Sequence, residues 1–182
     1  MNCSAVAVDA HLAALLREVV GDAVDDRPRR LAEYSSDASN YRVVPTAVVF
    51  PRHVDDILAV AEVCRREGVA LTARGGGTSC AGNAVGPGVV LDLSRHLGRV
   101  LAVDPDARTA RVEPGAVLDT LQAAAGRHGL RFGPDPSSHS RCTLGGMIGN
   151  NACGAHAMAY GTTAANVASL DLLDGRGRRL AV

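Results

Sequence analysis

Apolar residues recur with the period of an amphipathic helix in three segments of the chain. Apolar positions three and four residues apart occur in residues 9–21, 54–68 and 116–129, and a glycine ends each segment. This spacing places the apolar side chains on one face, and glycine is the residue most often found just after the last helical turn. We therefore expect three helices, the first of them with Asp9 as its N-cap.

The segment 54–68 has the clearest helical pattern. Asp55 and Asp56 lie in its first turn, where the helix dipole favours negative charge. The side chains expected to face the core are Val54, Ile57, Leu58, Ala61 and Cys64.

Short runs rich in β-branched residues predict strands between and after these helices. Residues 43–50 contain Pro45 and are followed by Pro51, and because proline cannot donate a ladder hydrogen bond we expect this strand near a sheet edge. The pair Asp174-Gly175 predicts a hairpin turn. Residues 22–42 are polar and lack a period, so we expect an ordered lead-in there. The other expected strands are 69–72, 89–93, 100–103, 109–112, 167–173 and 178–182, with those between 89 and 112 forming a meander.

Composition narrows the class of protein. The 182 residues are 47% hydrophobic, which is enough for one domain with a core. Nineteen basic and nineteen acidic residues balance and only 3% are aromatic, so neither charge nor stacking favours a nucleic-acid partner. No stretch approaches the roughly 18 apolar residues of a membrane span. The cysteines lack metal-ligand spacing, which favours reduced thiols in a cytoplasmic protein without a metal site; they are Cys3, Cys64, Cys80, Cys142 and Cys153.

Two glycine-rich segments carry the candidate chemistry, Arg74-Gly75-Gly76-Gly77-Thr78-Ser79 and Thr143 to Gly154. Glycine admits positive φ and lets a ligand approach the main chain, so successive N–H groups can converge on an anion. The charge of Arg74 and the hydroxyl groups after the glycines favour an anion at the first segment. No Gly-Lys-Ser/Thr follows, as in a P-loop, and the G-x-G-x-x-G spacing of a dinucleotide-binding fold is absent.

The second segment combines small residues with a pair of amides. Gly145 and Gly146 alone are equally well explained by close packing of a helix on a sheet. That packing does not explain Asn150 and Asn151, whose amides would be costly to bury without partners. We therefore expect this segment to lie along a planar heterocycle and its ribityl or ribose tail.

A succession of short motifs extends from residue 34 to residue 162. It consists of Tyr34-Ser35-Ser36-Asp37-Ala38-Ser39, residues 45–51, Asp55-Asp56-Ile57, Arg74 to Thr78, Val112-Glu113-Pro114-Gly115, Pro134-Asp135-Pro136, Thr143 to Gly154 and Tyr160-Gly161-Thr162. In this order the motifs resemble the flavin-binding (PCMH-type) domain of the vanillyl-alcohol oxidase superfamily. Within that superfamily they are similar to FAD-linked D-lactate and D-2-hydroxy-acid dehydrogenases and to the glycolate oxidase FAD subunit.

The resemblance implies an α+β fold, with a small subdomain that contains a βαβ unit and the start of a larger mixed-sheet subdomain. Residues 1–42 would be an N-terminal helix and lead-in, and residues 43–182 an FAD-binding domain that is incomplete at its C-terminal end. A strand that ends the chain without a partner beyond it also predicts a fragment.

The resemblance also implies a site for FAD. Main-chain N–H groups of the first segment would hold the pyrophosphate. Relatives with covalently attached flavin carry histidine at the position of Thr78, so the threonine implies noncovalent FAD. The implied cofactor-binding residues are Arg74, Gly75, Gly76, Gly77, Thr78, Ser79, Pro134, Asp135, Thr143, Gly145, Gly146, Asn150, Cys153 and Gly154.

No catalytic residue can be assigned. In the family, a cap domain beyond this segment carries the substrate-binding arginine and the catalytic histidine or metal ligands. The expected partners are a small 2-hydroxy acid, an electron acceptor of unknown identity, and a cap or iron–sulfur domain on another segment or chain. For His139 and His156 a structural hydrogen-bonding role is favoured over acid–base catalysis, and for Cys142 and Cys153 packing is favoured over redox chemistry.

Three functions are open at this stage. The chain is the FAD-binding part of an enzyme that oxidises a D-2-hydroxy acid by hydride transfer to flavin N5, or a noncatalytic FAD-binding module or split subunit that needs a partner's cap, or a truncated product that holds no FAD.

Overall fold

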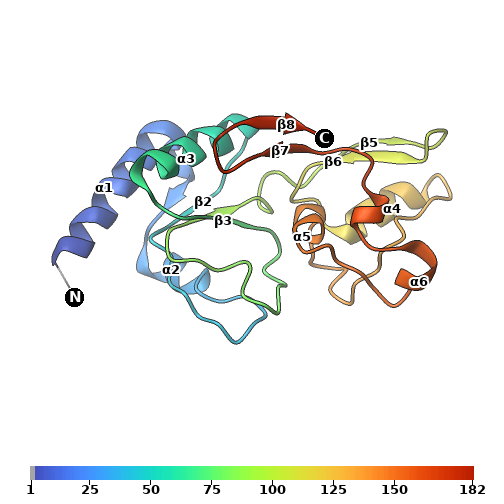
Figure 1. Ribbon diagram of the computed structural model, residues 1–182, viewed down its shortest axis with the longest axis horizontal. Coiled ribbons are helices and arrows are strands. Elements are labelled where there is room, and N and C mark those ends of the chain that lie inside the picture. The colour runs from blue at the N-terminus through green and yellow to red at the C-terminus, as the bar shows by residue number, and fades with distance from the viewer. Residues whose placement is uncertain (1–2) are drawn as a thin grey trace.

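Three short parallel strands form the centre of the first lobe in the computed structural model, which describes residues 3–182 (Figure 1). They are β2 (Ala47–Val49), β3 (Leu71–Arg74) and β4 (Val89–Asp92), with β4 in the middle. A fourth strand, β1 (Val24–Asp25), pairs antiparallel with β2 and gives the order β1-β2-β4-β3. Because β2 and β4 are buried along their whole length, both faces of this sheet are covered there.

Helices α1 (Cys3–Val20) and α3 (Val54–Glu67) lie side by side over one face of the sheet (Figure 1). Leu16 of α1 and Val60 of α3 pack there with alternate strand residues and are fully buried. Side chains alternate along a strand, so Val48 faces the other way. On that opposite face Tyr34, which ends the short helix α2 (Pro28–Glu33), contacts the ring of Phe50 edge-on, with 5.7 Å between the ring centroids.

The second lobe has its own core, built from local elements. The hairpin β5 (Val100–Asp104) and β6 (Thr109–Val112) packs with α4 (Leu118–Gly126) and α5 (Leu144–Gly149). The short helix α6 (Ala157–Tyr160) and the hairpin of β7 (Asp171–Leu173) and β8 (Arg179–Ala181) complete the described chain. Single 3-10 turns cover Gly21–Ala23 and Ala164–Asn166. The core residues are Ala116, Leu118, Leu121, Cys142, Leu144 and Met147.

The expected helices and most expected strands are confirmed within a few residues. The helix 54–67 ends at Gly68, which adopts a left-handed conformation with φ 65°, and the turn at residues 104–109 joins the predicted strand pair. The predicted hairpin at residues 174–175 is also present. The α+β class with a βαβ unit is therefore confirmed, because α3 connects the parallel strands β2 and β3.

Two expectations at the N-terminal end are wrong. Helix α1 already begins at Cys3, so Asp9 is inside the helix and not its N-cap; no glycine or proline interrupts residues 3–9. The segment 22–42 is ordered, as expected, and forms β1 and α2. Strand β1 covers the outer side of β2, which is therefore an interior strand and not an edge, and Pro45 and Pro51 lie just outside its ends.

Two further expectations fail on packing. The predicted buried face of α3 is partly wrong: Cys64 is buried and Ile57 packs against the core as expected, but Val60 and Val63 are also buried whereas Val54 is 48% exposed. Strand β4 does not continue into a meander with β5 and β6 but pairs with β2 and β3 in the first sheet. Within residues 3–182 no helix is long and apolar enough to cross a membrane, and no cluster of three potential metal ligands occurs.

Candidate anion-binding site at the glycine segments

The first glycine segment leaves the sheet at the carboxyl end of β3. Strands β3 and β4 are parallel, and Arg74 pairs with Asp92 at their last shared position. In open sheets with parallel strands, ligands bind outside the carboxyl ends of the strands. The chain therefore enters residues 75–79 at the edge of the sheet where a ligand is expected.

Five successive main-chain N–H groups of this segment lack an acceptor within the described part of the protein. Residues 75–79 lie outside every helix and strand, and none of their N–H groups donates a hydrogen bond among those found in residues 3–182. Gly77 has φ 66°, in the left-handed region. A run of free N–H groups around such a residue forms a concave site for an anion. This cradle, residues 75–79, is the part of the chain best suited to a phosphate group.

The two glycine-rich segments are in close contact with each other. A Cβ atom at Gly75 would lie 2.0 Å from the Thr143 hydroxyl oxygen, and one at Gly76 would lie 2.1 Å from the Arg141 carbonyl oxygen. Both distances are far below van der Waals contact, so only glycine fits at either position. The side-chain amide of Asn83 also donates to that of Asn150, with 2.6 Å between nitrogen and oxygen. These contacts join the cradle of the first lobe to the second lobe.

The second segment forms a short helix, which was not predicted. Thr143 is its N-cap and is almost fully buried, and its hydroxyl oxygen accepts the N–H of Gly146 at 3.3 Å. Gly145 donates its N–H to the Pro114 carbonyl at 2.8 Å, and a Cβ there would lie equally close to that oxygen. Gly145 therefore serves close packing of α5, the structural explanation that the sequence left open, whereas a Cβ at Gly146 would meet only the Thr143 hydroxyl oxygen, at 3.2 Å.

The argument from buried amides is wrong. Asn150 and Asn151 are exposed, and both have protein partners. Asn150 donates to the Gly146 carbonyl at 2.9 Å, and the Asn151 side chain accepts the N–H of Ala164 at 2.9 Å. Asn151 has φ 45°, a left-handed conformation that asparagine tolerates better than most residues. Their presence therefore needs no ligand.

The loop around Asp135 meets the end of the second segment. Pro134 is buried, and a Cβ at Gly154 would lie 2.2 Å from a carboxylate oxygen of Asp135. The same carboxylate accepts hydrogen bonds from the ring and main-chain nitrogens of His156. The hydrogen bond from the His156 ring is the main cause of the lowered pKa of Asp135. His156 thus makes a hydrogen bond of the kind predicted for it.

The remaining candidate side chains differ in their surroundings. His139 also has a carboxylate partner, Asp119, at 2.7 Å. Cys142 is buried in the second core, and burial raises the pKa of its thiol, so its predicted packing role is confirmed. The same prediction for Cys153 is wrong, because that residue is exposed. The N–H groups of Cys153 and Gly154 donate no hydrogen bond among those found within residues 3–182, so this end of the segment also offers free donors.

Two side chains at the first segment have partners within the protein itself. Nη1 of Arg74 donates to the carbonyl oxygens of Ser36 and Ala84, and the Ser79 hydroxyl oxygen accepts the N–H groups of Ala81 and Asn83. The sequence indicates this segment as a candidate site but does not indicate that its side chains bind the protein itself.

Sequence reasoning did not single out two residues that shape this loop, Asn83 and Asp37. The Asp37 carboxylate accepts the N–H groups of Ala84 and Ser39. Its pKa is lowered because these hydrogen bonds outweigh the opposing effect of burial. Asp37 belongs to one of the motifs above, whereas nothing local distinguishes Asn83.

Comparison with known proteins identifies relatives of the chain. The model of a family described as FAD binding domain matches residues 45–182. D-2-hydroxyglutarate dehydrogenase of Pseudomonas putida is 41% identical over 149 residues, which are 80% of this chain and 15% of that protein. Glycolate oxidase subunit GlcD of Escherichia coli is 34% identical over 174 residues, 93% of this chain and 35% of that protein. The chain thus spans about a sixth to a third of the length of these relatives.

Solved structures share the fold at lower sequence identity. An alkyldihydroxyacetonephosphate synthase superimposes on 95% of this chain with a TM-score of 0.84 and 20% identity, using 35% of its own chain. A p-cresol methylhydroxylase superimposes on 96% of this chain with a TM-score of 0.79 and 17% identity, also using 35% of its own chain. The predicted PCMH-type fold is therefore confirmed.

Proposed function

The chain belongs to the FAD binding domain family, and we propose that it holds FAD noncovalently as the flavin-binding part of an oxidoreductase that acts on D-2-hydroxy acids. The observation that carries this proposal is the cradle of five free N–H groups at residues 75–79, next to the second glycine segment. A pyrophosphate offers several anionic oxygens to such donors.

The residues present fit FAD in three respects. The cradle would bind the pyrophosphate. The free N–H groups of Cys153 and Gly154, beside Pro134 and Asp135, would bind another part of the cofactor. Thr78 has a hydroxyl where a covalent flavin link would need a histidine or another nucleophile, which supports noncovalent binding.

Bound FAD would supply a hydride acceptor at flavin N5 for the oxidation of a hydroxyl-bearing carbon. The contribution of this chain is to bind and orient the cofactor through its main chain. The oxidation also needs a base that removes the hydroxyl proton. The Nδ1 atoms of His139 and His156 contact the carboxylates of Asp119 and Asp135, and we assign both histidines a structural role. That base and the substrate-binding groups are assigned to polypeptide outside these 182 residues, in keeping with the fraction of each relative that the chain spans.

Substrate class and compartment rest on separate support. The relatives include a D-2-hydroxyglutarate dehydrogenase, a glycolate oxidase subunit and a D-lactate dehydrogenase, whose names all refer to 2-hydroxy acids. The cytoplasm is the proposed compartment because Cys80 and Cys153 are exposed free thiols, which persist in a reducing environment.

The test is flavin retention followed by reduction. Protein purified with added FAD should keep the visible flavin absorbance after gel filtration, and protein that keeps none refutes the proposal. The retained flavin should then bleach under anaerobic D-2-hydroxyglutarate, D-lactate or glycolate, with the L-enantiomers as controls where they exist. Retention without bleaching would identify an FAD-binding module that needs a partner for catalysis.

A further inference from the structure

The Arg74 guanidinium occupies the space directly beside the cradle. A Cβ at Gly77 would lie 2.6 Å from Nη2 of Arg74. Nη1 donates to the Ser36 carbonyl at 2.9 Å and to the Ala84 carbonyl at 3.0 Å. Arg74 therefore ties together three separate loops, which contain residues 36, 77 and 84.

Tyr34 contacts this guanidinium. The guanidinium carbon lies over the Tyr34 ring, 4.9 Å from its centre, in a cation–π contact. The Tyr34 hydroxyl donates to the Asp92 carboxylate at 2.5 Å, and burial and this bond raise the pKa of the phenol. Asp92 is buried at the end of β4 and also accepts the N–H and hydroxyl groups of Ser94. The ring is thus anchored to the sheet.

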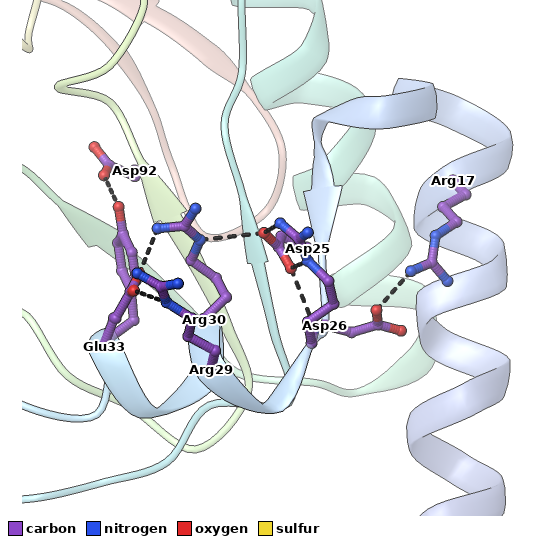
Figure 2. A network of polar contacts seen from close by, with 9 residues as sticks. Arg17, Asp25, Asp26, Arg29, Arg30, Glu33 and Asp92 are labelled. Carbon is purple, nitrogen blue, oxygen red and sulfur yellow. Dashed lines mark hydrogen bonds and ion pairs between the residues drawn. The ribbon is translucent and has the colours of Figure 1, made fainter.

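Further polar contacts lie in the same region. Figure 2 shows them as separate groups, in which Arg17 of α1 pairs with Asp26, Arg30 pairs with Asp25 and Glu33, and the Tyr34 hydroxyl donates to Asp92. All of these residues except Asp92 lie before residue 45, where the family match begins. The N-terminal segment is therefore built into the support of the cradle.

We propose that Arg74 is a positioning residue of the FAD site: clamped by Tyr34, it sets the backbone conformation of residues 75–79 and does not itself bind the pyrophosphate. This role of Arg74 rests on the proposed FAD function. The position of Arg74 before three glycines suggests a contact with phosphate, and the role proposed here is a different one. The role requires a planar side chain that packs on the Tyr34 ring and donates hydrogen bonds to the Ser36 and Ala84 carbonyls. Lysine cannot provide such a group.

Two variants separate positioning from phosphate binding. Arg74→Lys keeps the charge and Arg74→Met removes it, and both should weaken FAD binding about tenfold or more, the loss expected for a charged hydrogen bond. The dependence of FAD affinity on salt should stay as in the wild type, because no cation has been withdrawn from the phosphates. Arg66→Met, which removes an exposed arginine of α3, and Val63→Ala, which weakens the first core, are the controls and should bind FAD within about twofold of wild type.

A second readout needs no flavin. The Ala38 N–H donates to the Gly77 carbonyl at 3.1 Å, so its exchange with solvent reports the position of the loop. In protein without FAD, Arg74→Met, Arg74→Lys and Tyr34→Leu should each speed exchange at Ala38 about tenfold or more. Neither control variant should do so.

The outcomes are distinct. Wild-type affinity in Arg74→Lys with loss only in Arg74→Met, or a weaker salt dependence in Arg74→Met, would show direct phosphate binding and overturn the positioning role. Unchanged exchange at Ala38 in all three loop variants would overturn it as well. Wild-type protein that binds no FAD would refute the proposed function, while faster exchange at Ala38 in the variants would still establish that Arg74 positions the loop.

Discussion

Replacing Gly76 by alanine should damage the junction between the two lobes more than any other single methyl group added to the cradle. The new Cβ would lie 2.1 Å from the Arg141 carbonyl oxygen and 3.0 Å from its carbonyl carbon. These atoms are main chain, so no side-chain rotation relieves the overlap, and the two segments would have to separate by about 1 Å to restore contact distances. Gly76 does not have a positive φ, so the cost is steric and not torsional.

The expected magnitude follows from the cost of overpacking a well-packed contact, which is about 1–3 kcal/mol in the free energy of unfolding. Gly126 provides a matched control, because no atom lies within 4 Å of a Cβ there and the residue is the last of α4. Alanine at that position should be neutral or stabilise the protein by up to about 1 kcal/mol. The two glycine-to-alanine changes should therefore differ in sign or by more than about 1 kcal/mol.

Urea unfolding followed by circular dichroism measures both variants, and flavin retention after gel filtration gives the functional effect. Gly76→Ala should unfold at lower urea and lose FAD, whereas Gly126→Ala should keep both properties. Equal unfolding midpoints for the two variants would refute the contact between the glycine segments. A destabilised Gly76→Ala that binds FAD as tightly as wild type would refute the cradle as the cofactor site.

Three further predictions concern single side chains. Met147→Ala should lower the free energy of unfolding by about 2–5 kcal/mol, because the side chain is fully buried in the second core; a loss below about 1 kcal/mol in urea unfolding would contradict that packing. Thr143→Ala should cost about 1 kcal/mol by removing the N-cap of α5, and Thr143→Ser, which keeps the hydroxyl, should restore most of the thermal stability. Hydrogen bonds from Arg27 hold the pKa of the buried Asp25 carboxyl group well below its usual value. The stabilisation of the folded state by the Asp25 carboxylate is therefore complete above about pH 4 and is lost as the pH falls below that value. Asp25→Asn should therefore be less stable than wild type at neutral pH, and the difference in melting temperature should shrink in acid; a constant difference down to about pH 2 would exclude this ion pair as its cause.

The sequence by itself determined the features that depend on neighbours along the chain. The period of residues 54–67 and the following Gly68 define α3, and Asp174-Gly175 defines the last hairpin, because helix faces, caps and tight turns are set by residues a few positions apart. The order of short motifs also identified the family and both glycine segments, since a ligand that binds main-chain N–H groups constrains the local residue types directly.

Only the tertiary structure decided what the side chains at the site do. Tyr34 meets Asp92 across 58 positions, Arg74 reaches the Ser36 carbonyl across 38, and Asn83 meets Asn150 across 67. Such partners are brought together by the pairing of strands and the packing of the two lobes, and no local period encodes them. For the same reason the sequence pattern did not predict the two-residue strand β1, which lies in a polar segment. The pairing of β1 with β2 makes β2 an interior strand. The sequence predicts a glycine-rich backbone segment suited to an anion, and the fold supplies the contacts that hold this segment in one conformation.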